Sequence, residues 1–263
     1  MLGNKIFRDD GRAVIVPIDH GLAGVVPGWE NPGETLTKIV AGRPDAVMTT
    51  YGNLKRYRHL LEGKTAMLLR LDTGNSPFVE DNLDAWALRY TVEDAIRLGC
   101  AGVLLMGWFG APCEMESVQI CAEVAAECDR TGMALCIETF PLPGPKVPKD
   151  EVLHPKHVAT TCRLAYEYGA DFIKTHYTNS TESFKQVVAS CPIPVLIAGG
   201  AKTDTEREWL QTVTDMLAAG GKGVWSGRNT WQHKDPAAMV RAMVDVIHGG
   251  ASVADALKEF KQK

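Results

Sequence analysis

The sequence predicts a single domain over residues 1–263, folded as a (β/α)8 (TIM) barrel. Three observations favour this class. Short apolar runs alternate with longer amphipathic runs along the whole chain, eight apolar runs can be counted, and the length is close to the roughly 250 residues that such barrels use. A doubly wound open sheet is the alternative fold, because it is built from the same alternation.

Each apolar run is expected to be a parallel strand that is buried on both faces, because helices cover parallel sheets. The eight expected strands are Ala13–Asp19, Ala46–Thr49, Ala66–Asp72, Ala101–Gly107, Ala134–Thr139, Asp171–Tyr177, Pro194–Gly199 and Gly223–Gly227. Helices are expected between them, for example at Thr91–Leu98, Met115–Thr131, His157–Tyr168, Thr181–Ser190 and Asp204–Ala219. Glycine is the residue expected just after a helix, and it stands there at Gly99, Gly132, Gly169 and Gly221.

Composition narrows the class of protein further. The net charge of -4 gives no general reason to bind nucleic acid or an anionic membrane surface. No apolar run reaches the roughly 20 residues that span a bilayer. The seven cysteines form no CxxC pair, so we interpret them as structural thiols of a cytoplasmic protein. We expect no metal site, because the sequence shows no ligand cluster, and no nucleic-acid or membrane partner.

Lys174 is the residue that says most about function. It lies in the middle of the apolar run Asp171–Tyr177, where a charged ammonium would be costly to bury. Apolar surroundings favour the neutral amine, which can attack a carbonyl carbon and form a Schiff base. The alternative is a lysine at the end of its strand that reaches solvent with its charged group.

Other polar residues are expected at the same end of the barrel, where the chemistry of this fold takes place. Asp19 and His20 end the first strand, Arg70-Leu71-Asp72 ends the third, and Glu138 ends the fifth. His176 shares a strand face with Lys174, because side chains alternate along a strand. Asp19, Glu138 and His176 are candidate acid/base groups beside Lys174. Alternatively, a carboxylate keeps the lysine charged as an ion pair, and Asp19 caps a short helix that starts at His20.

Glycines follow the last two expected strands. The runs are Gly199-Gly200-Ala201-Lys202 and Gly227-Arg228-Asn229. In these barrels, the loops after strands 7 and 8 frequently bind a phosphate through backbone N–H groups. Arg228 would add a charged donor, and Lys202 is either a substrate-binding residue or a solvated surface charge.

With these pieces together, the sequence resembles the DeoC/FbaB/LacD-type class I aldolases, most of all the archaeal-type fructose-bisphosphate aldolases and the autoinducer-2 thiolases. The matching segments, in family order, are Val16–Gly21, Gly169–Lys174, Tyr177-Thr178, Gly199–Thr203 and Gly227–Gln232. The resemblance implies that Lys174 forms the Schiff base and that Asp19 is an active-site carboxylate. It also implies a phosphate site at Gly199, Gly200, Gly227 and Arg228.

One departure from the family pattern concerns the acid/base group. The fructose-bisphosphate aldolases carry a catalytic tyrosine after strand 5, and Phe140 stands in its place here. Phenylalanine cannot transfer a proton, so fructose 1,6-bisphosphate is in doubt as the substrate. Glu138, two residues earlier on the same face, is our candidate replacement, and His176 is the other.

The sequence therefore predicts a class I lyase that cleaves or forms a carbon–carbon bond in a phosphorylated ketose-like substrate. It needs no cofactor, because the lysine imine acts as the electron sink. His20 and Lys202 are expected to contact substrate, and we expect a homo-oligomer. Two alternatives stay open: thiolase-like acyl transfer from a phosphorylated diketone to coenzyme A with the same lysine, and a phosphate-binding barrel without imine chemistry.

Overall fold

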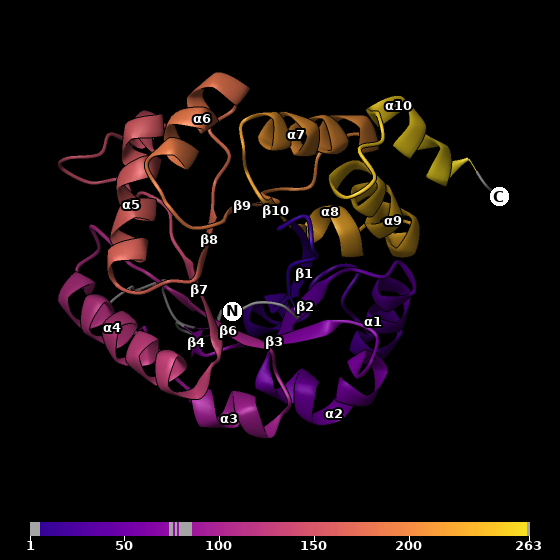
Figure 1. The fold of residues 1–263 in the computed structure, drawn as a ribbon. Helices are drawn as coiled ribbons and strands as arrows, with labels where there is room; N and C mark the ends of the chain where they lie inside the picture. The colour runs from indigo at the N-terminus through magenta and orange to yellow at the C-terminus, as the bar shows by residue number, and fades with distance from the viewer. Residues whose placement is uncertain (1–5, 74–75, 77, 79–85, 262–263) are drawn as a thin grey trace.

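The structure is a computed structural model, and it describes residues 6–73, 76, 78 and 86–261. Its centre is a closed barrel of eight parallel strands in the order β1-β10-β9-β8-β7-β6-β3-β2. This arrangement confirms the predicted (β/α)8 barrel, and the closure excludes the open sheet. Figure 1 shows the helices as a ring around the strands.

The observed elements begin and end close to the expected residues. The barrel strands are β1 (Ala13–Ile18), β2 (Ala46–Thr49), β3 (Ala66–Arg70), β6 (Gly102–Met106), β7 (Ala134–Glu138), β8 (Phe172–Thr175), β9 (Val195–Ala198) and β10 (Gly223–Trp225). A separate two-stranded sheet pairs β4 (Asp72–Thr73) with β5 (Ala87–Leu88). The helices are α1 (Pro32–Ala41), α2 (Tyr51–Leu61), α3 (Val92–Arg97), α4 (Glu114–Thr131), α5 (Pro155–Glu167), α6 (Thr181–Ala189), α7 (Glu206–Ala218), α8 (Arg228–Trp231), α9 (Pro236–Ile247) and α10 (Val253–Ala256). Short 3-10 turns lie at His20–Ala23, Lys149–Glu151 and Leu257–Phe260.

Local signals fix where the helices start. Asn31 accepts the N–H of Glu34 at the start of α1, and Pro32 follows it at the first helical position. Thr91 and Thr205 begin α3 and α7 with reciprocal capping boxes. Within the described residues, no helix is long and apolar enough to cross a membrane.

The barrel interior is filled from its N-terminal end. Ile6 is 1% exposed and belongs to the same apolar cluster as Ile15, Phe172 and Trp225, all inside the barrel. A second, larger cluster fills the layer between the strands and the helices. The interior is therefore a packed core, and only its C-terminal end is left for polar groups.

Gly223 shows why the barrel closes where it does. It pairs with Ala13 across the β1–β10 seam and has a φ of +144°. A Cβ at this position would lie 1.9 Å from the carbonyl oxygen of Ala13. Only glycine permits this approach of the first and last strands.

One expected helix end needs correction. Gly99, Gly132 and Gly169 adopt the left-handed backbone expected after a helix. After α7, however, the left-handed residue is Gly220, with a φ of +95°, and not Gly221. A Cβ on Gly221 would meet the Met216 sulfur at 2.4 Å, so this second glycine permits close packing instead.

His248 joins the C-terminal part of the chain to the N-terminal end of the barrel through two carboxylates. Its Nδ1 lies 2.7 Å from Asp10 Oδ2, and its Nε2 lies 2.8 Å from Asp45 Oδ2. Asp45 also contacts Arg8 and accepts the backbone N–H of Val14. Burial and the nearby Arg8 both act to lower the pKa of His248. The two carboxylates have the larger effect, so the pKa of His248 is raised.

This pair of contacts predicts a pH-dependent stability. Because the folded pKa is raised above the unfolded value of about 6.5, the stabilisation is complete below that value and is lost as the pH rises through the folded pKa. We expect His248→Gln to lower the free energy of unfolding by about 1–2 kcal/mol at pH 6 and by clearly less at pH 9. Urea unfolding at both pH values measures this, with the exposed His59→Gln as control. An equal loss at both pH values would show that the charge of His248 is irrelevant.

Candidate active site

Lys174 lies inside the barrel near its C-terminal end. It is the third residue of β8, opposite Glu138 of β7 in the strand register, and only 7% of its surface is exposed. Its amine lies 5.3 Å from the centre of the Trp225 ring, so this indole forms part of the surface against which the amine packs. The lysine therefore does not reach out into solvent, which was the alternative left open by the sequence.

Glu138 is the direct partner of this amine. Its Oε1 lies 2.6 Å from Lys174 Nζ, and its Oε2 lies 3.5 Å from a guanidinium nitrogen of Arg70. Glu138 is itself only 7% exposed. The shared register of β7 and β8 thus produces a short, buried carboxylate–amine contact, at which a proton can pass directly between the two groups.

Asp19 reaches the same cluster from β1. Its side chain makes no helix-capping hydrogen bond, although it precedes the 3-10 turn at His20. Instead its Oδ2 accepts a hydrogen bond of 2.7 Å from Arg70, and its Oδ1 lies 3.4 Å from His20 Nδ1. Burial alone would raise the pKa of Asp19, but His20, Arg70 and Lys174 together lower it far below its usual range. Asp19 is therefore ionised at neutral pH.

His176 belongs to an aromatic wall beside the cluster. Its ring stacks on Phe140 at 4.5 Å between ring centres, and Phe140 packs edge-on against Trp108 at 6.4 Å. Burial lowers the pKa of His176, and Lys174 adds to this effect while Glu138 opposes it. The imidazole is therefore neutral at neutral pH and can accept a proton.

The glycine loops lie after β9 and β10, and their glycines have different contacts. The N–H of Gly199 donates to the carbonyl of Trp225 at 2.8 Å, so it is not available to a phosphate. Gly200 is exposed, with a left-handed φ of +61°. Gly227 precedes α8, where a Cβ would lie 3.3 Å from the Pro17 ring, and Arg228 is the first residue of that helix.

Asn229 links these two loops through side-chain hydrogen bonds. Its amide nitrogen donates to the carbonyls of Gly199 and Ala201 at 3.0 and 3.2 Å. Its oxygen accepts the backbone N–H and the hydroxyl of Thr203, at 2.8 and 3.1 Å. Asn229 is 2% exposed, so these four contacts fix the spacing of the loops in a buried place. The sequence showed the position of Asn229 but not this role.

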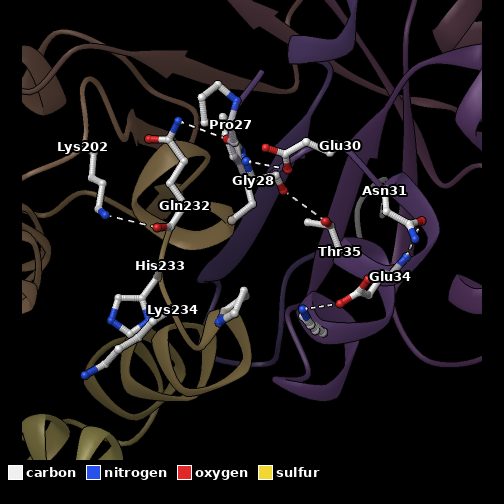
Figure 2. A pocket seen from close by; sticks show the side chains of 13 residues that line it. Pro27, Gly28, Glu30, Asn31, Glu34, Thr35, Lys202, Gln232, His233 and Lys234 are labelled. Carbon is white, nitrogen blue, oxygen red and sulfur yellow. Dashed lines mark hydrogen bonds and ion pairs between the residues drawn. The ribbon is translucent and has the colours of Figure 1, made fainter. Parts of the chain in front are cut away.

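Lys202 lies at a cavity outside the lysine cluster. The cavity has a volume of about 580 Å³ and is bordered by the loop before α1, by the start of α1 and by the turn between α8 and α9. Figure 2 shows the amine of Lys202 directed at the backbone oxygen of Gln232, and that contact is 3.1 Å long. Lys202 is exposed, in keeping with the surface position that the sequence left open.

Arg70 and Asp72 are the residues whose importance the sequence did not show. Arg70 contacts Asp19, Asp72 and Glu138, and the Asp72 carboxylate is fully buried beneath it. The spacing of two residues at a strand end places both on one face, which was the available signal. Among the described residues, no group of three or more His, Cys, Asp and Glu side chains is arranged to hold a metal ion.

The comparisons with known proteins identify the family of this chain. The model of the DeoC/LacD family aldolases matches residues 13–233, so the chain belongs to that family. An uncharacterized aldolase of Saccharolobus solfataricus is 37% identical over 99% of this chain and 100% of its own length. The 2-amino-3,7-dideoxy-D-threo-hept-6-ulosonate synthase of Halobacterium salinarum is 36% identical over 97% of this chain and 93% of its own.

Solved structures of similar proteins include Schiff-base aldolases. An archaeal fructose 1,6-bisphosphate aldolase superimposes with a TM-score of 0.85 at 27% identity, over 95% of this chain and 100% of its own. Another archaeal fructose-1,6-bisphosphate aldolase structure, with its catalytic lysine covalently bound to the carbinolamine intermediate, has a TM-score of 0.84 at 27% identity, over 94% and 99% of the two chains. This chain is thus an aldolase-family barrel with Schiff-base aldolases among its structural relatives.

Proposed function

We propose that this protein is a class I aldolase that uses Lys174 to form a Schiff base with a phosphorylated ketose-like substrate. The observation that carries the proposal is the contact of 2.6 Å between Lys174 and Glu138 at the C-terminal end of the barrel. A buried amine with a carboxylate at this distance has a built-in proton acceptor. Membership of the aldolase family supports the same chemistry.

Imine formation begins with the lysine proton. Transfer from the ammonium of Lys174 to Glu138 gives a neutral amine and a carboxylic acid, and the amine lone pair then attacks the substrate carbonyl. After the attack one proton moves from the nitrogen to the former carbonyl oxygen, which gives the carbinolamine. The carbinolamine loses water when Glu138 returns its proton to the leaving hydroxyl. Glu138 therefore acts first as base and then as acid, and it regains its starting state.

Cleavage of the carbon–carbon bond needs a second base, because the departing fragment must lose a hydroxyl proton. The protonated imine withdraws the bonding electrons and becomes an enamine. His176 is suited to take the proton, because its imidazole is neutral and stands at the aromatic wall. Asp19 is a poor base, because its pKa is far lowered, and it is suited to hold a substrate hydroxyl as a hydrogen-bond acceptor.

The phosphate of the substrate is proposed to lie at the loops after β9 and β10. Gly200 and Gly227 keep the place free of side chains, Asn229 holds the loops together, and Arg228 supplies the cation. Within the described residues, the Arg228 side chain has no ion pair or hydrogen bond of its own. Binding there would orient the carbonyl toward Lys174, which lowers the barrier through positioning.

The role of Lys174 is tested by trapping. Incubation with dihydroxyacetone phosphate and borohydride should add the reduced three-carbon phosphate to the peptide that contains Lys174, as measured by mass spectrometry. Lys174→Met should abolish the adduct and leave the fold intact, because methionine fills a similar volume. Lys222→Met, at an exposed position before β10, is the control and should be trapped like the wild type. Lack of trapping in the wild-type protein would contradict the proposal, and turnover that requires coenzyme A would favour the thiolase alternative.

The assignment of the two proton-transfer groups predicts different defects. Glu138→Gln should slow imine trapping and turnover by about 10²–10⁴-fold, the usual contribution of a positioned acid/base. His176→Gln should slow turnover alone, because it acts after the imine has formed. Single-turnover trapping rates beside steady-state rates separate the two. Wild-type trapping by Glu138→Gln would remove Glu138 from the first step.

The phosphate site predicts a selective loss. Arg228→Ala should weaken binding of dihydroxyacetone phosphate by about 1.5–3 kcal/mol, the range for a charged hydrogen bond. It should have little effect on slow trapping of unphosphorylated dihydroxyacetone. The exposed Arg207→Ala on α7 serves as a control for general loss of positive charge. Equal losses with both ketones would show that Arg228 has a structural role only.

A further inference from the structure

Arg70 stands at the centre of a buried group of charges. One guanidinium nitrogen, Nη1, lies 2.7 Å from Asp19 Oδ2 and 3.5 Å from Glu138 Oε2. The Nε lies 3.1 Å from Asp72 Oδ1. The arginine side chain is 16% exposed, so all three contacts are largely shielded from water. Arg70 thus joins the two carboxylates that border the proposed reaction site.

Asp72 fixes the position of the Arg70 side chain through a buried hydrogen-bond network. Its Oδ1 accepts from Arg70 Nε, while its Oδ2 accepts the indole N–H of Trp86 at 2.6 Å and the backbone N–H of Met106 at 2.8 Å. The Asp72 side chain has no exposed surface. Because Asp72 is anchored to β6 and to Trp86, it fixes the direction in which the guanidinium points.

The arginine offsets part of the negative charge of this group. The ion pairs join three carboxylates, of Asp19, Asp72 and Glu138, to two cations, Arg70 and Lys174. Within the described part of the chain, removal of Arg70 would leave the three carboxylates with Lys174 and, beside Asp19, with the ionisable imidazole of His20. The ammonium form of Lys174 would then be favoured by nearby uncompensated carboxylates, and the free amine would be harder to form.

We propose that Arg70 is a positioning residue for the imine reaction: its positive charge offsets the carboxylates around Lys174 and its guanidinium holds Asp19 and Glu138 in place, so that the ammonium of Lys174 can give up its proton to Glu138. The inference rests on the proposed function of the site. In the step concerned, an N–H bond of the Lys174 ammonium breaks and an O–H bond forms on Glu138. The electron pair left on the nitrogen is the one that attacks the carbonyl. Arg70 touches neither the substrate nor the transferred proton.

The first test follows the free amine without a substrate. Competitive labelling with trace acetic anhydride, read by mass spectrometry on the Lys174 peptide, gives the fraction of reactive amine at each pH. In Arg70→Met the labelling curve should move to higher pH by about one unit, so that labelling at a fixed pH on the rising part is about tenfold slower. Arg70→Lys restores the charge, and its curve should return toward the wild-type curve. Arg241→Met on the outer helix α9 controls for loss of a cation elsewhere.

A second neutral variant guards against a folding defect. Arg70→Gln removes the charge and keeps hydrogen-bond donors toward the carboxylates, and it should show the same shift as Arg70→Met. A purely structural arginine would lower the unfolding midpoint in both variants without moving the labelling curve. Superposition of the curves of the folded Arg70→Gln variant and the wild type would overturn the proposal.

The second test separates this inference from the proposed function. Borohydride trapping with dihydroxyacetone phosphate should be slowed at least tenfold in Arg70→Gln at neutral pH and should recover as the pH is raised. No trapping in the wild type would refute the Schiff-base function, whereas the labelling curves would still decide whether Arg70 controls the amine. Trapping by the wild type together with an unshifted trapping profile in Arg70→Gln would refute the role of Arg70 alone.

Discussion

The contact network of Arg70 with Asp19, Asp72 and Glu138 is the constraint on which the lysine end of the barrel depends. Charges buried in this way lose their hydration, and only close, well-directed partners offset that cost. Asp19 comes from the end of β1, Arg70 from β3, Glu138 from β7 and Lys174 from β8. No local segment can therefore assemble the network. It requires the assembled barrel, in which β1 pairs with both β10 and β2.

The same closure divides the polar end of the barrel into two chemically different parts. The strands β1, β3, β7 and β8 supply ionised groups that are already paired with one another. The loops after β9 and β10 supply glycines, Arg228 and Asn229, whose hydrogen bonds link the two loops. A substrate anion would meet repulsion at the first part, where the described carboxylates outnumber the described cations, and attraction at the second. This charge distribution supports the proposed orientation of the substrate, with its phosphate at the glycine loops.

Features that depend on neighbouring residues could be predicted from the sequence, and features that depend on residues distant in the chain could not. Strand and helix positions could be predicted because hydrophobic runs and helix-end signals are patterns of neighbouring residues. Lys174 could be singled out because one charge in an apolar strand is unusual. Arg70 and Asn229 could not be assigned, since their roles depend on partners 51 and 30 residues away in sequence. Gly199 shows the opposite error: its place in the motif suggested a phosphate donor, but its N–H belongs to the contact with Trp225.

The proposed use of Glu138 as the acid/base group, with Phe140 where the aldolases that the sequence resembles carry a tyrosine, is consistent with this network. A tyrosine is neutral at neutral pH and can be buried without a counter-charge. A buried carboxylate in the proposed role is costly without close partners of opposite charge, so it needs a cation besides the lysine that it serves. Arg70 is that cation for Glu138. Phe140 packs against His176 and Trp108, and burial lowers the pKa of the imidazole. In the proposed mechanism the glutamate and the arginine therefore act together, and a tyrosine introduced at position 140 would not by itself make Glu138 dispensable.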